Sequence, residues 1–180
     1  MALTHKQDFN PKNRRNIFLS ALFLIFIVTA CKISYSFSGA SISPQVKTLS
    51  VQSFLNRAAL VQPGLDQILT DALIDKCRAQ TGLEMVSSFG DVDFEGEITD
   101  YKTEPVTVAA DAYAATNRFT ITVRVRFTNT IDTDLSFDQS FTRYEDYNSD
   151  LNISEVEQTL VPNIIKMIVE DIFNKAFVNW

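Results

Sequence analysis

Residues Phe119 to Phe127 have the sequence FTITVRVRF, in which apolar and polar side chains alternate without a break. The odd-numbered positions are all apolar, and the even-numbered positions carry threonine or arginine. Strict alternation is typical of a strand that packs one face on a core and exposes the other to solvent. This stretch therefore predicts an antiparallel sheet with one apolar and one polar face.

Weaker alternation on both sides of this stretch predicts further strands. Residues 92–98 carry apolar side chains at most even positions and acidic ones at odd positions, and residues 135–141 alternate after a short turn. The alanine-rich residues 102–117 are expected to form a loop longer than a hairpin needs. Shorter strands are expected within 47–54 and 83–86.

Two segments have the three-to-four residue spacing of amphipathic helices. The first follows Pro63-Gly64, and Gly82 is expected to end it in the left-handed conformation. The second is expected to begin at a capping box of Ser154 and Glu157, and Pro162 to kink or restart it. The apolar face predicted for the first helix carries Leu65, Ile68, Leu69, Ala72 and Leu73.

These elements together predict an α+β fold. We expect a two-layer sandwich of a mostly antiparallel sheet, with about four to five strands and two helices packed on one face.

The amino-terminal residues have the pattern of an export signal. A basic leader precedes residues 17–28 (IFLSALFLIFIV), a run of twelve residues that would reach only about 18 Å as a helix, short of a bilayer core of about 30 Å. The following Val28-Thr29-Ala30-Cys31 is similar to a bacterial lipobox, in which the cysteine is alkylated with diacylglycerol and acylated after cleavage. The alternative is an ordinary signal followed by a chance cysteine.

This pattern predicts a signal peptide at 1–30, a lipidated tether at 31–44 and a single α+β domain at 45–180. Lys32 follows the cysteine, where an aspartate would resemble an inner-membrane retention signal. We therefore expect a lipid-anchored protein on the periplasmic side of the outer membrane.

Composition excludes several classes of function. Without the leader the formal charge is −9, from 12 basic and 21 acidic residues, which argues against binding to nucleic acid. The single histidine, His5, lies in the leader, so histidine-based catalysis and histidine-ligated metals are not expected. Cys77, on the first helix, is expected to be a packed thiol. The sequence predicts a non-enzymatic protein without cofactor or metal.

The polar face of the sheet carries the candidate binding residues. Asp93, Glu95 and Glu97 lie on one predicted strand and could pair with arginines of its neighbour or, as a second possibility, act as catalytic acids. Arginine also suits anionic groups such as phosphates, so contact with an anionic ligand or a partner is a third possibility. The arginines that we consider for such contact are Arg118, Arg124, Arg126 and Arg143.

The chain from Cys31 to Trp180 resembles the LptE family of lipopolysaccharide-assembly lipoproteins, in the branch found in Bacteroidetes. The resemblance depends on the order and spacing of several short segments. These are Tyr35-Ser-Phe-Ser-Gly39, Lys47-Thr-Leu-Ser-Val51, Asn56-Arg-Ala58, Phe94-Glu-Gly-Glu-Ile98, Asn117-Arg-Phe-Thr-Ile-Thr-Val123, and Glu170-Asp-Ile-Phe-Asn174 through Trp180.

The resemblance implies a lipid-anchored α+β domain that acts as plug and assembly partner of the outer-membrane barrel LptD. It also implies a role in moving lipopolysaccharide to the cell surface, with lipopolysaccharide itself as a possible ligand. The alternative is a free-standing periplasmic lipoprotein that binds a small amphipathic ligand between sheet and helices.

Overall fold

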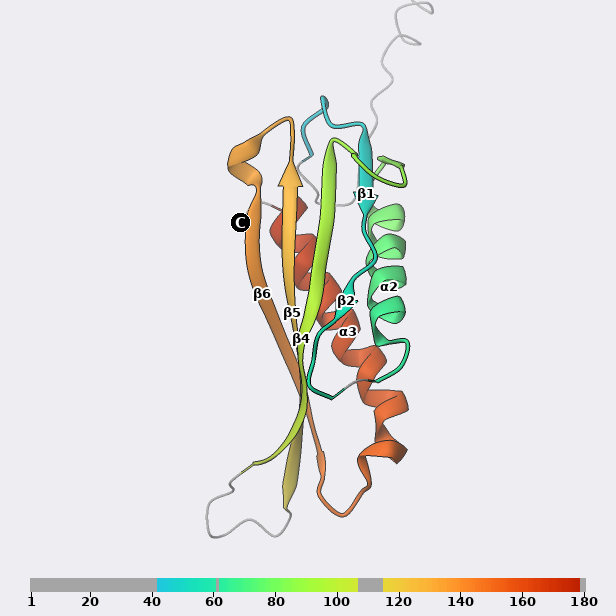
Figure 1. Ribbon diagram of the computed structural model, residues 1–180, viewed down its shortest axis with the longest axis vertical. Helices are drawn as coiled ribbons and strands as arrows, with labels where there is room; N and C mark the ends of the chain where they lie inside the picture. The colour runs from blue at the N-terminus through green and yellow to red at the C-terminus, as the bar shows by residue number, and fades with distance from the viewer. Residues whose placement is uncertain (1–41, 61, 107–114, 179–180) are drawn as a thin grey trace, which may run out of the picture. The chain divides into compact units, whose positions relative to one another are not determined.

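The computed structural model describes residues 42–60, 62–106 and 115–178, which form a sheet with two helices on one face (Figure 1). The predicted α+β sandwich is confirmed, although the sheet has six strands and is mixed. The elements are β1 (Thr48–Val51), β2 (Leu55–Asn56), α2 (Leu65–Gln80), β3 (Glu84–Met85), β4 (Val92–Val106), β5 (Thr116–Asn129), the 3-10 turn η1 (Thr133–Leu135), β6 (Phe137–Asn148) and α3 (Ile153–Phe177).

The sheet has an antiparallel half and a parallel half. Strands β4, β5 and β6 form a long antiparallel meander, whereas β1 pairs in parallel with β3 and β4, and β2 pairs in parallel with β4. The strand order is β3-β1-β4-β5-β6, with β2 also on β4. The parallel half arises because the chain passes through α2 between β1 and β3, and a helical crossover returns a strand in the same direction.

The predicted loop over residues 102–117 is wrong at both of its ends. Strand β4 continues to Val106 and β5 begins at Thr116. The register between them shifts between Ile98 and Asp100, where one extra residue forms a bulge. Beyond the bulge the buried positions become odd-numbered, as at Tyr101. The alternation of residues 92–98 therefore does not continue in phase, and a search for period two does not detect the second half of the strand.

Helix α2 begins where predicted but ends for a different reason. Gly64 is its N-cap and has a φ of 84°, a conformation that glycine adopts without penalty. The expected left-handed stop at Gly82 is wrong, because Thr81 ends the helix in an extended conformation. The Thr81 hydroxyl and backbone N–H both donate to the carbonyl oxygen of Cys77, which is one of the carbonyl groups in the last turn of the helix that need a hydrogen-bond partner. On its predicted apolar face, Ile68 is 42% exposed.

Helix α3 runs from Ile153 to Phe177 with Pro162 inside it. Its N-cap is Asn152, whose side-chain oxygen accepts a hydrogen bond from the Ser154 N–H, so the predicted capping box at Ser154 is wrong. The apolar face expected from the three-to-four residue spacing of this segment is confirmed. The buried residues are Leu160, Val161, Ile164, Ile165, Ile168, Val169, Ile172, Phe173 and Phe177.

The core lies between the helices and the apolar face of the sheet. Phe94 of β4 and Phe127 of β5 have ring centroids 4.7 Å apart, and the Phe177 ring packs edge-on to both. This cluster fixes the end of α3 against the start of β4. Among the residues that the structure describes, no helix is long and apolar enough to cross a membrane.

Candidate functional site

Alternation along β4, β5 and β6 places polar side chains on the sheet face that the helices leave uncovered. Arg124 and Arg126 are exposed on this face, while the intervening Val125 is buried in the core. Glu95 of β4 lies opposite Arg126, and Glu97 lies opposite Arg124. The predicted juxtaposition of an acidic and a basic strand is therefore confirmed, and we call this surface the open face.

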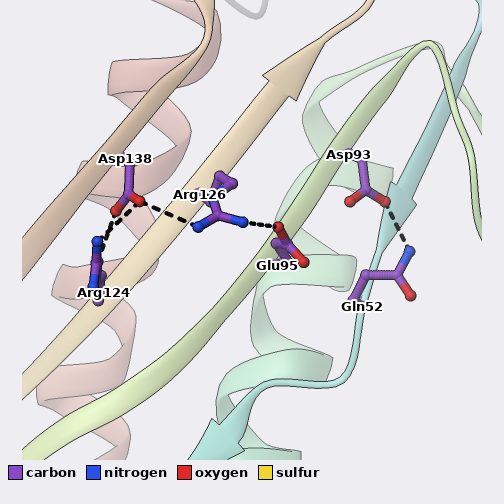
Figure 2. A network of polar contacts seen from close by, with 6 residues as sticks. All are labelled: Gln52, Asp93, Glu95, Arg124, Arg126 and Asp138. Atoms are coloured by element: carbon purple, nitrogen blue, oxygen red, sulfur yellow. Dashed lines mark hydrogen bonds and ion pairs between the residues drawn. The ribbon is translucent and has the colours of Figure 1, made fainter.

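A chain of ion pairs crosses the open face from β4 to β6 (Figure 2). The Arg126 guanidinium contacts Glu95 Oε1 at 2.9 Å and Asp138 Oδ2 at 3.5 Å. Arg124 donates to both carboxylate oxygens of Asp138, at 2.8 and 3.1 Å. Asp138 thus binds both arginines, and the fork of Arg124 is already filled by a carboxylate.

The protonation states on the open face follow from these contacts. Hydrogen bonding from Arg124 lowers the pKa of Asp138, and the same bond raises the pKa of Arg124. Both groups therefore stay charged at neutral pH. A carboxylate held in its ionised form is a poor general acid, so Asp138 is not tuned for proton transfer.

A shallow hollow of about 270 Å³ lies beside this ion-pair chain. Gly96 contributes to its lining, and a Cβ atom there would lie 2.6 Å from the Phe54 ring and 2.4 Å from the Arg124 carbonyl oxygen. Only glycine fits where the segment between β1 and β2 presses Phe54 against β4. The lining residues are Gln52, Ser53, Leu55, Glu95, Gly96, Glu97, Arg124, Arg126 and Asp138.

Arg118 forms a separate pair further along β5. Its guanidinium donates to both oxygens of Asp146 on β6, at 2.8 and 2.9 Å, and lies 3.7 Å from the centre of the Tyr144 ring. Hydrogen bonding from Arg118 lowers the pKa of Asp146. Arg118 is therefore occupied on its edge by a carboxylate and on its face by an aromatic ring.

Arg143 lies apart from the other three arginines. It pairs in register with the buried Ile121, so its side chain extends on the helix side of the sheet. There it donates to both oxygens of Asp171 on α3, at 2.6 and 2.7 Å. The four arginines considered from the sequence thus do not form one site: three lie on the open face, and Arg143 joins β6 to α3.

The open face as a whole carries more acidic than basic groups. Its four cations each contact at least one carboxylate, and its net charge is negative. This net charge and the carboxylates already bound to the arginines both oppose binding of a free anion. The charged residues of this face are Asp93, Glu95, Glu97, Asp100, Glu104, Asp138 and Asp146, with Lys102, Arg118, Arg124 and Arg126.

Cys77 is fully buried on α2, as its predicted packing role requires. Burial raises the pKa of its thiol to about 12, against an opposing effect of the Lys76 charge. Within the described residues, no group of three His, Cys, Asp or Glu side chains could hold a metal ion. Cys31, the signal peptide and most of the tether lie outside the described residues.

Sequence reasoning missed the aspartates that hold the arginines. Asp138 and Asp146 occupy alternate polar positions of β6, so their face could be inferred from period two, but their partners could not. The pairing of Arg143 with Asp171 has no signal in the sequence, because it depends on how α3 crosses the sheet.

Comparisons with known proteins agree on the family and the fold. A family model described as LptE, lipopolysaccharide-assembly, matches residues 46–176. No curated protein matches the sequence.

Two solved structures illustrate how far the likeness of fold extends. Rare lipoprotein B from Shewanella oneidensis has a TM-score of 0.51 at 12% identity, covering 71% of this chain and 92% of its own. A hypothetical protein from Chlamydia trachomatis has a TM-score of 0.50 at 9% identity, covering 74% of this chain and 99% of its own. At these identities the likeness shows the fold alone. The family match extends over most of the chain and spans β1 to α3, and the chain therefore belongs to the LptE family of lipopolysaccharide-assembly proteins.

Proposed function

We propose that this protein is an outer-membrane lipoprotein that acts as plug and assembly partner of an LptD-type barrel in lipopolysaccharide transport. The observation that carries the proposal is the family match over residues 46–176. The lipobox ending at Cys31 supports lipid anchoring on the periplasmic side of the outer membrane. The anchor, the partner and the location are inferred together from these two features.

The open face has the chemistry that a barrel plug needs. The interior of outer-membrane barrels is polar, so a domain inside one must present polar surface. The open face does so with ion pairs that are already satisfied within the domain, such as Arg124 with Asp138 and Arg118 with Asp146. These two arginines and their aspartates meet a second polar surface as compensated pairs, and the excess of acidic groups leaves the face negatively charged there.

The arginines are better suited to partner contact than to direct capture of lipopolysaccharide. Arg118 and Arg124 each bind a carboxylate through two donors. The net negative charge of the open face opposes a lipid phosphate, whereas an uncharged polar barrel wall can bind at the remaining arginine donors and at the neighbouring Thr122 and Thr142 hydroxyls, which lie 3.0 Å apart. We retain contact with a ligand or partner at Arg118, Arg124, Arg126 and Arg143 as a prediction.

The test is recovery of the barrel with the tagged protein. The full chain with a carboxyl-terminal tag is purified from detergent-solubilised outer membranes, and its partners are identified by mass spectrometry. We expect a stoichiometric large β-barrel with the native chain and less of it with the charge reversals Arg124→Glu and Arg126→Glu combined. Arg78→Glu on α2 is the matched control, because Arg78 is exposed and its ion pair among the described residues is with the neighbouring Asp75. Recovery of the lipoprotein alone would contradict the proposal.

A second candidate function is a free-standing lipoprotein that binds an amphipathic ligand. A largely apolar hollow of about 280 Å³ between α2 and α3 favours this function. Its lining residues are Ile68, Ala72, Lys76, Pro162, Ile165, Lys166, Val169 and Glu170. This hollow lies between the two helices and not between sheet and helices, where the alternative was expected. This second function predicts that the protein is purified as a monomer together with lipid and without a barrel. The same purification from outer membranes tests this prediction.

A further inference from the structure

Three segments of the chain meet at one end of the sheet, at the top of Figure 1. They are residues 42–47 before β1, residues 86–91 before β4 and residues 130–136 between β5 and β6. We call this end of the domain the loop end. The described part of the chain begins at this end, in residues 42–47.

Asp91 holds the three segments together. Its carboxylate accepts hydrogen bonds from the backbone N–H groups of Lys47 and Thr48, at 2.8 and 2.9 Å. Its carbonyl oxygen accepts from the Thr130 N–H and hydroxyl, both at 2.9 Å. The loop end is therefore one connected surface.

Phe89 projects from this surface in a way that the fold does not require. Its side chain is 97% exposed, and its φ of 56° is unusual for a bulky residue. The next residue is held to β1 through the Gly90 N–H, which donates to the Ser50 hydroxyl at 3.0 Å. An exposed aromatic side chain on a strained backbone is a feature that folding alone would not select, and such strain is concentrated at functional sites.

Two further large apolar side chains are exposed on the segment between β5 and β6. Ile131 is 41% exposed and Leu135 is 36% exposed. The charged residues beside them, Asp132 and Asp134, give this part of the surface no positive charge. Across the three segments of the loop end, Lys47 is the one basic residue against Asp91, Asp132 and Asp134, so the surface lacks the cluster of basic residues that recognises anionic lipids.

The length of chain before β1 determines which surface lies near the loop end. Cys31 precedes Ile42 by eleven residues, which span at most about 36–40 Å when fully extended. The opposite end of the sheet lies further away, because β4 alone extends about 46 Å from Val92 to Val106 at about 3.3 Å per residue. A bilayer that holds the acyl chains of Cys31 is therefore closest to the loop end.

We propose that the loop end is a membrane-docking surface, with Phe89 inserted among the headgroups of the bilayer that carries the lipid anchor. The inference rests on the anchor in the proposed function and concerns the anchored chain before it meets a barrel. An aromatic ring gains free energy at the interface between water and hydrocarbon. The lack of a basic cluster in the three segments of the loop end fits a zwitterionic lipid surface. In the docked orientation the loop end faces the bilayer, and strands β4 and β5 extend away from it.

Tryptophan fluorescence in vesicles of known composition tests this surface. The full lipidated chain, with Trp180→Phe, is reconstituted into vesicles of phosphatidylcholine and phosphatidylethanolamine that contain brominated phosphatidylcholine as a quencher. Single tryptophans are introduced by Phe89→Trp, Leu135→Trp or Leu151→Trp. Leu151 is the matched control, because it is 45% exposed and lies in the turn after β6 at the opposite end of the sheet.

We expect several-fold stronger quenching at positions 89 and 135 than at position 151. In the Leu135→Trp chain, Phe89→Glu should reduce the quenching, whereas Leu151→Glu should not. Far-ultraviolet circular dichroism checks folding, which Phe89→Glu should leave intact since the side chain contacts little of the protein.

Flotation of the vesicles separates the two ways in which the inference can fail. A chain that floats with the vesicles but shows equal quenching at all three positions overturns the docking surface and leaves the proposed function standing. A chain that does not float lacks the anchor, and this overturns the inference together with the lipid attachment on which it rests.

Discussion

At the scale of single residues, Gly96 is the position where the fold leaves no room for a side chain. The buried ring of Phe54 packs against β4 here, on the side of the strand that faces the core. The contact joins the segment between β1 and β2 to the central strand of the sheet. The packing of Phe54 against β4 therefore depends on the absence of a Cβ atom at this position.

We expect Gly96→Ala to lower the free energy of unfolding by about 1–3 kcal/mol, because the added methyl group overlaps the Phe54 ring and the Arg124 carbonyl oxygen. Urea denaturation measures the change. Gly82→Ala is the control, since a Cβ there meets nothing within 4 Å, and it should change stability by less than about 1 kcal/mol. Equal effects of the two substitutions would contradict the close approach of Phe54.

Cys77 should react with thiol reagents only when the domain unfolds. Its side chain is fully buried, and burial raises the pKa of the thiol to about 12, so very little thiolate exists at pH 8. Mass spectrometry after iodoacetamide treatment should show almost no alkylation of the folded chain and complete alkylation in denaturant. Rapid labelling of the folded protein would mean that α2 opens readily.

At the scale of secondary-structure elements, the start of α3 distinguishes the structure from the sequence prediction. Asn152→Ala should lower the free energy of unfolding by about 1 kcal/mol, because the side chain of Asn152 accepts the Ser154 N–H at 3.1 Å. Ser154→Ala should have a clearly smaller effect in the same denaturation experiment. The opposite order of the two effects would restore the predicted capping box.

The pair formed by Arg143 and Asp171 is expected to fasten α3 to the edge of the sheet. A double-mutant cycle with Arg143→Gln and Asp171→Asn should give a coupling free energy of about 0.5–1 kcal/mol, limited by the partial exposure of both side chains. The coupling should fall in high salt, where screening weakens it. The pair of Asp75 and Arg78 on α2, which is more exposed, serves as the control cycle and should give less coupling.

At the scale of the whole molecule, acid should destabilise the domain through its paired aspartates. Backbone N–H groups of Lys47 and Thr48 lower the pKa of Asp91, and bonds from Arg124 and Arg118 lower those of Asp138 and Asp146. The pKa of each group when folded is then below its value of about 3.9 in the unfolded chain. Between the folded and unfolded pKa values the unfolded chain binds more protons than the folded chain. The stabilisation is therefore complete above about pH 4–5 and is lost as the pH falls from there through the folded pKa values.

Urea midpoints measured between pH 7 and pH 2.5 test this expectation. Asp91→Asn should lower stability at pH 7 and reduce its loss in acid, since the carboxylate that joins the loop-end segments is gone. Asp75→Asn, on the exposed side of α2, is the control and should reproduce the native profile. A native chain whose midpoint stays constant down to pH 2.5 would show that these contacts do not stabilise the fold.

The sequence by itself determined that a sheet packs against two helices, and which side chains of these elements face the core. The alternation of residues 119–127 and the helical stripes of α2 and α3 are local periodicities, and a local period specifies which side of an element is apolar. The same period places Arg124 and Arg126 on the polar face of the sheet. The resemblance that indicated the LptE family was likewise carried by short segments in order.

Only the tertiary structure decided how these elements pair and which charges meet. The bulge after Ile98, the parallel placement of β1 and the bond from Arg143 to Asp171 join residues that are distant along the chain. The gathering of residues 42–47, 86–91 and 130–136 into one end around Asp91 has the same origin. Such contacts depend on the spatial arrangement of whole elements, which no local period specifies.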